Sequence, residues 1–155
     1  MAPSRRAALA LALTLVTGAP AMATEATPAT VRARVDHHLK QVERLSGHFE
    51  AVLGADCPRF PSRAEWDAYV DTETDGLVLL VAHLEQAWVE AKRTGDDDVR
   101  RAAKAPKRQG DQGRALVDKL ATCAEMNGAS FSPTVVWRRI EREVPRRQAE
   151  IALPR

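Results

Sequence analysis

Beyond the first 23 residues, the His and Met side chains that could be ligands of a haem iron or a transition metal are His37, His38, His48, His83 and Met126. The sequence has no Cys-x-x-Cys-His motif, which excludes covalent attachment of c-type haem. On one helix, His37 and His48 would lie about 16 Å apart, and the adjacent His37 and His38 would diverge by about 100°. We therefore predict no metal site and no cofactor. His38 falls in an apolar stripe and is expected to be a packed core residue.

Glu73 is an acidic residue in an otherwise apolar helical stripe, so we expect its side chain to point inward. Counting turns from the shared end of the first two helices places His38 within about one turn of Glu73, with Arg114 and Arg147 near the same level. This pattern predicts an interior site for a small anionic or polar ligand, with Arg114 or Arg147 as its anchor and His38 and Glu73 as hydrogen-bonding partners. The alternative is a buried salt-bridge network that fixes the helix register.

The segment 100–119 carries seven basic residues: Arg100, Arg101, Lys104, Lys107, Arg108, Arg114 and Lys119. We expect Lys104, Lys107 and Arg108 to contact a partner, either a protein or a cell-envelope component. The alternative is a solvated face that complements the acidic second helix. With 3 Trp and 1 Tyr, the chain offers few platforms for stacking bases, so nucleic acid is not expected.

The first 23 residues have the pattern of a secretory signal peptide. Arg5 and Arg6 precede the apolar segment 7–17, and Ala21-Met22-Ala23 matches a small-x-small cleavage site. The apolar segment is too short for a stable membrane span, so no transmembrane anchor is expected. Removal of the leader would take two of the 23 basic residues and leave 21 basic against 21 acidic residues. We predict an exported protein, most simply periplasmic and otherwise extracellular.

Cys57 and Cys123 are the only cysteines, and in an oxidising compartment they are expected to form a disulfide. In an antiparallel bundle, the first interhelical loop and the end of the third helix lie at the same end, which agrees with this pairing.

The spacing of apolar residues predicts an all-α fold, a four-helix up-down-up-down bundle. Residues 24–30 read as a flexible lead-in, and 31–155 as a single domain. The first helix is expected to end at Gly54. The second follows Ser62 and continues across Gly76, or alternatively breaks there. The third runs from about Asp96 to Asn127 with a kink or loop within 106–113. The fourth follows Ser132 and is kinked or ended at Pro145.

These features favour a small exported binding or accessory protein without catalytic chemistry of its own. The alternative is a carrier of a small anionic ligand, haem or metal in the bundle interior. A small hydrolase is a third hypothesis, but carboxylates such as Glu73 and Asp71 or Asp75, two residues apart on a helix, face different directions. No catalytic residue is predicted.

Overall fold

The computed structural model describes residues 27–104 and 107–151, and all regular secondary structure in these ranges is α-helical. The side chains of Pro28, Lys107 and Arg108 are outside the described part, as is the proposed leader 1–23. The helices are α1 (Pro28–Gly54), α2 (Arg63–Ala91), α3 (Asp97–Lys104), α4 (Lys107–Met126) and α5 (Pro133–Glu150). The predicted all-α fold is therefore confirmed.

The helix boundaries follow local capping chemistry. The Thr27 side chain accepts from the backbone N–H of Thr30, so α1 begins inside the predicted lead-in, at Pro28. The Ser62 side chain caps α2 by accepting from Glu65 N–H. α2 then continues for 29 residues across Gly76, as favoured from the sequence.

The predicted third helix is divided into α3 and α4. The Asp96 side chain accepts from the backbone N–H groups of Asp98 and Val99 and so caps α3. Residues 105–106, including Pro106 at the start of the predicted kink, lie outside the described part. α4 is helical from Lys107 and passes through Gly110 and Gly113, so the predicted break does not extend to these glycines. Gly128, with φ +60°, follows its end, as expected for a helix C-terminus.

α5 begins at Pro133 and runs through Pro145 to Glu150. The alternative in which this helix ends at Pro145 is therefore wrong. Beyond Pro145, Ile151 donates from its N–H to the carbonyl of Arg147 and packs against the apolar core, and this tertiary packing stabilises the final turn.

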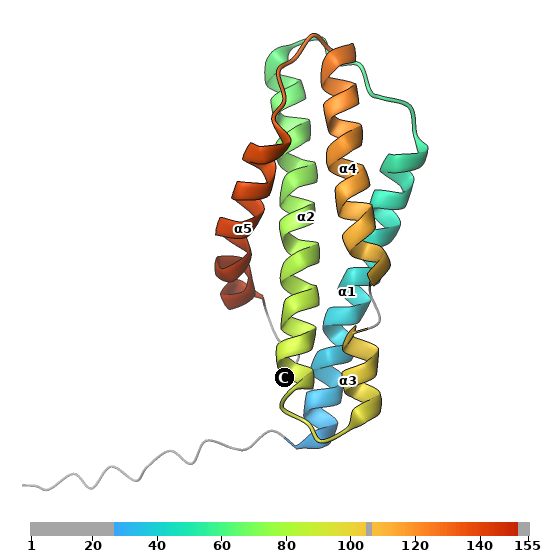
Figure 1. Ribbon diagram of the computed structural model, residues 1–155, viewed down its shortest axis with the longest axis vertical. Helices are drawn as coiled ribbons and strands as arrows, with labels where there is room; N and C mark the ends of the chain where they lie inside the picture. The colour runs from blue at the N-terminus through green and yellow to red at the C-terminus, as the bar shows by residue number, and fades with distance from the viewer. Residues whose placement is uncertain (1–26, 105–106, 152–155) are drawn as a thin grey trace, which may run out of the picture.

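The helices form an elongated antiparallel bundle. In Figure 1, α1 runs upward, α2 downward, α3 and α4 upward, and α5 downward. α4 packs on α1, α5 packs on α2, and α3 covers the lower ends of α1 and α2. The up-down order is thus retained, with α3 and α4 together in the place of the predicted third helix.

The main core runs along the shared axis of α1, α2, α4 and α5. Its largest fully buried apolar side chains are Phe49, Leu77, Leu80, Leu116 and Leu120. α3 packs through a separate, smaller cluster that contains Val35, Ala87, Ala91, Val99 and Ala103. Small side chains allow this short helix to approach the two long ones closely.

A disulfide joins Cys57 in the α1–α2 loop to Cys123 in the last turn of α4, with Cα atoms 5.3 Å apart. The prediction of this pair and of its place at one end of the bundle is confirmed. The Asn127 side chain adds a second link there: it accepts from Phe60 N–H and donates to the carbonyl of Pro58. These contacts fix the α1–α2 loop on the end of α4.

Candidate functional site

The structure separates the two central residues of the predicted polar layer. Glu73 Oε2 lies 3.0 Å from Nε2 of His48, whereas Nδ1 of His38 lies 2.9 Å from Nδ1 of His83. α1 and α2 are antiparallel. The segment from His48 back to His38 on α1 therefore runs alongside the segment from Glu73 forward to His83 on α2, and the two segments have the same length. At 1.5 Å per residue, the two pairs are about 15 Å apart along the helices. The predicted pairing of His38 with Glu73 is wrong.

The offset between the two helices accounts for four of the ten residues that separate the two pairs. The rest arises because His38 lies 16 residues before Gly54 whereas Glu73 lies ten residues after Arg63. His48 lies six residues before the last residue of α1, Gly54, whereas its partner Glu73 lies ten residues after the first residue of α2, Arg63. α2 therefore begins about one turn beyond the end of α1. The sequence gives the height along each helix, but the loop and its disulfide set this offset.

Glu73 and His48 form a structural pair at the edge of the core. The carboxylate side chain is 4 % exposed, while the His48 ring is half-exposed. The pKa of the nearby Tyr69 is raised, first by burial and second by the charge of Glu73. No second acidic or nucleophilic side chain is hydrogen-bonded to Glu73 in the described part of the chain, and its contact with His48 joins α1 to α2.

His38 and His83 form a buried imidazole pair between α1 and α2. Burial is the main cause that lowers the pKa of His38 to about 4, and the neighbouring His83 and His37 lower it further. The pKa of His83 is also lowered, by burial first and then by the charges of His37 and Arg44. Both rings are therefore neutral near pH 7, and one Nδ1–H donates to the other Nδ1.

His83 also lines a hollow of about 190 Å³ together with Leu79, Arg147, Glu150 and Ile151. Arg147 donates from Nη1 to Glu150 Oε2 at 3.2 Å, and its Nε is buried without a hydrogen-bond partner. Of the four residues predicted to form an interior site, His38 and Arg147 are thus connected through His83. Arg114 is exposed on α4 and does not line this hollow, and Glu73 does not reach it.

Sequence reasoning considered His83 only as an isolated metal or haem ligand. An antiparallel pair of helices places some residue of α2 opposite His38, but only the offset of the two helices shows that this residue is His83. Among residues 27–104 and 107–151, no group of three or more His, Cys, Asp or Glu side chains is placed to hold a metal ion.

A second candidate site is the cationic groove between the end of α2 and α3. We use this name for the surface formed by Trp88, Lys92, Asp97, Arg100, Arg101 and Lys104. The ammonium groups of Lys92 and Lys104 lie 5.2 and 4.8 Å from the centre of the Trp88 ring. Both distances are those of cation–π contacts.

Of the residues predicted to contact a partner, Lys104 lies in this groove. The predicted residues Lys107 and Arg108 begin α4, and their side chains lie outside the described part. Trp88 and Lys92 were not among the residues predicted from the sequence to contact a partner. Their i, i+4 spacing and the same spacing of Arg100 and Lys104 were the available signals.

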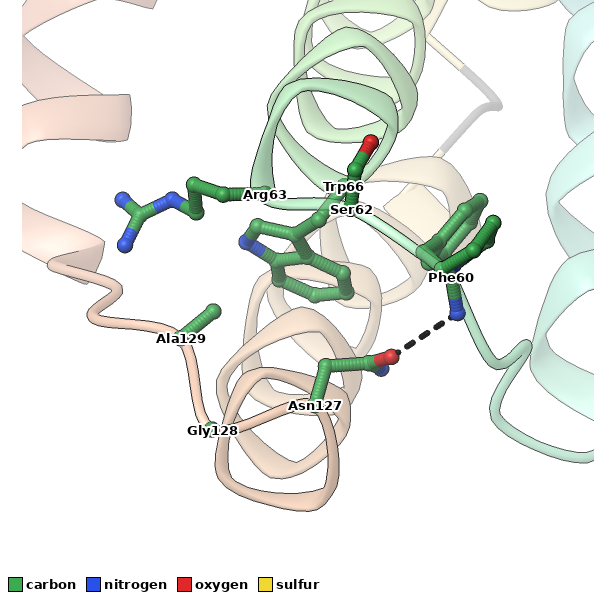
Figure 2. Close-up of a pocket in the computed structure, with 8 residues that line it drawn as sticks. Phe60, Ser62, Arg63, Trp66, Asn127, Gly128 and Ala129 are labelled. Atoms are coloured by element: carbon green, nitrogen blue, oxygen red, sulfur yellow. Dashed lines mark hydrogen bonds between the residues drawn. The ribbon is translucent and has the colours of Figure 1, made fainter.

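A third hollow, of about 150 Å³, lies at the disulfide end and is shown in Figure 2. Phe60 and Trp66 supply its aromatic walls, and the dashed line marks the hydrogen bond from Phe60 N–H to the Asn127 side chain. The amide nitrogen of Asn127 donates to the carbonyls of Pro58 and Cys123. These polar groups hold the loop to α4, which explains their positions without a ligand.

Comparisons with protein-family models, with curated proteins and with solved structures give no match. None of the described helices is long and apolar enough to cross a membrane. The fold and sites define a disulfide-linked helical bundle with a cationic groove on one part of its surface and a buried histidine pair beside a small hollow.

Proposed function

We propose that this protein is an exported, non-enzymatic binding module whose cationic groove engages an acidic surface of a partner protein. The leader pattern in residues 1–23 supports export. The disulfide between Cys57 and Cys123 supports it further, because such bonds persist in oxidising compartments.

The charge distribution of the groove is the observation that carries this proposal. Arg100 pairs with Asp97 at 2.6 Å, and Arg101 pairs with Asp98 at 2.9 Å. Within the described residues, Lys92 and Lys104 instead contact only the face of Trp88 and have no carboxylate partner. Two ammonium groups held on a rigid aromatic ring are well placed to receive carboxylates.

An acidic protein fits this surface better than a lipid bilayer does. Stable binding in a bilayer interface requires an exposed apolar face on the inserted helix. In α3, Val99 and Ala103 are instead buried against α1 and α2, and Ala102 is the one exposed apolar residue. The groove thus offers charge and one half-buried aromatic ring to a partner.

The test is binding of a fluorescein-labelled hexaglutamate peptide, followed by fluorescence anisotropy with the disulfide-intact protein. Lys92→Ala/Lys104→Ala should weaken binding by about tenfold or more at low salt, and added salt should weaken binding of the original protein. The matched control is Arg138→Ala/Arg142→Ala, which removes the same charge from α5 and should change the affinity by less than about twofold.

Equal losses in the two double variants would show that only net charge matters and would overturn the proposal. Binding to phosphatidylglycerol vesicles without binding to the peptide would also overturn it, in favour of a membrane-surface role. Circular dichroism of each variant checks that the helices are retained.

A further inference from the structure

The hollow beside His83 combines hydrogen-bond donors with apolar walls. It lies where α5 packs on α2 and is separate from the cationic groove. Leu79 and Ile151 supply apolar surface, Arg147 and His83 supply N–H groups, and Glu150 lies at the side. This composition is typical of sites for small ligands with one anionic end.

The buried histidine pair determines which nitrogen of His83 can donate to a ligand. Nε2 of His38 is fully buried and has no hydrogen-bond partner. A buried N–H without a partner is rarer in proteins than an unused acceptor, so this atom is expected to carry the lone pair and not the proton. His38 then donates from Nδ1 to Nδ1 of His83, and the proton of His83 lies on Nε2.

Nε2 of His83 is therefore a free donor. No hydrogen bond to this atom is found within the described residues, and it is not among the fully buried unpartnered atoms. His83 is 8 % exposed and borders the hollow. The His38–His83 bond fixes a donor in this position.

Arg147 supplies the charge at the same site. Its Nε is buried and unpartnered, while Nη1 is held by Glu150 at 3.2 Å. Glu150 is also 3.6 Å from Nε of Arg146. The Arg147 side chain is 31 % exposed, so its guanidinium can still bind a carboxylate, and charge-assisted contacts of this type are the stronger hydrogen bonds in proteins.

We propose that this hollow binds a small monocarboxylate with a short apolar chain. The carboxylate accepts from the exposed part of the Arg147 guanidinium and from His83 Nε2–H, and the chain packs on Leu79 and Ile151. The hollow measures about 190 Å³, and its two apolar residues suit the short chain of a ligand such as hexanoate. Inorganic phosphate has the charge but no apolar part, so it should bind more weakly.

The test is titration of hexanoate into the full disulfide-intact protein near pH 7, followed by ¹⁵N chemical shifts of the imidazoles. We expect saturable binding with the largest change at His83 Nε2, and a free-state pattern in which His38 is protonated at Nδ1 and His83 at Nε2. Arg147→Gln should weaken binding by about tenfold or more. Glu150→Gln should bind at least as tightly as the original protein, because it removes a competing carboxylate.

Matched ligands and a matched variant make the result specific. Hexanol, with the same chain and no charge, should not produce the His83 change, and Arg142→Gln on the same helix should leave hexanoate binding unchanged. Absence of saturable shifts at about 20 mM hexanoate would overturn the proposal, since affinities weaker than millimolar carry no specificity. Equal binding of hexanol or phosphate, an unchanged affinity in Arg147→Gln, or the opposite histidine tautomers would also overturn it.

Discussion

His38 on α1 and His83 on α2 share a hydrogen bond between their Nδ1 atoms, which lie 2.9 Å apart. His38 is fully buried and His83 is 8 % exposed. This pair of neutral rings links the two longest helices of the bundle. The link therefore depends on the protonation of the two imidazoles.

The lowered pKa of His38 predicts a loss of stability in mild acid. The unfolded chain binds a proton near pH 6.5, whereas folded His38 does so only near pH 4, so this contribution is complete above pH 6.5 and is lost as the pH falls towards 4. One such group changes the free energy of unfolding by about 1.4 kcal/mol per pH unit. Urea unfolding at pH 7 and pH 4.5 measures the loss.

The control for this prediction replaces both rings. In His38→Leu/His83→Leu the hydrogen-bonded pair becomes two apolar side chains, so the fold should survive and the acid-induced loss should be smaller. Carboxylates such as Glu143, whose pKa is lowered by Arg139 against the opposing effect of burial, contribute equally to both proteins. An identical acid-induced loss in the double variant would contradict the prediction.

The carboxylate of Glu90 is fully buried, so we expect the stability of the protein to depend strongly on the side chains that pair with it. It accepts from Arg93 Nη1 at 3.0 and 3.1 Å and from Gln86 Nε2 at 3.0 Å, and Arg34 lies 3.6 Å away. Arg34→Ala/Arg93→Ala leaves this charge without a cationic partner and should lower the free energy of unfolding by about 3 kcal/mol. Adding Glu90→Gln should recover most of the loss. Urea denaturation that shows no recovery would contradict this explanation.

Replacing Gly47 or Gly76 with alanine is expected to change the stability of the protein differently. A Cβ at Gly47 in α1 would meet no atom within 4 Å, so Gly47→Ala should raise the free energy of unfolding by about 1 kcal/mol. A Cβ at Gly76 in α2 would lie 3.3 and 3.4 Å from ring atoms of Phe49, which is fully buried. Gly76→Ala should therefore raise the free energy of unfolding by clearly less than Gly47→Ala does, or should lower it. Equal thermal shifts for the two variants would contradict the predicted packing.

The disulfide predicts a large change in stability on reduction. It closes a loop with a sequence separation of 66 residues, for which the chain-entropy model gives about 4 kcal/mol. Urea unfolding of the oxidised protein and of Cys57→Ser/Cys123→Ser measures this difference. The hydrogen bonds of Asn127 to Phe60 and Pro58 remain, so the helices should still form. A change below about 1 kcal/mol would contradict the prediction.

Local chemistry in the sequence was enough to predict most helix boundaries. Ser62 and Pro133 specify helix starts, and Gly54 and Gly128 specify ends, because capping and backbone freedom depend only on neighbouring residues. Pro145 was the exception, because α5 continues beyond it to Glu150, and Ile151 at the end of this segment packs against the core.

Local sequence chemistry could not predict which polar side chains pair with each other across helices. The sequence itself determined that the chain is all-helical, that the two cysteines meet at one end, and that Glu73 and His38 point inward. The tertiary structure decided that Glu73 meets His48 and that His38 meets His83 beside Arg147. The physical reason is the axial offset of α1 and α2: a shift of one turn, about 5.4 Å, exchanges every partner across the interface without changing which face is apolar.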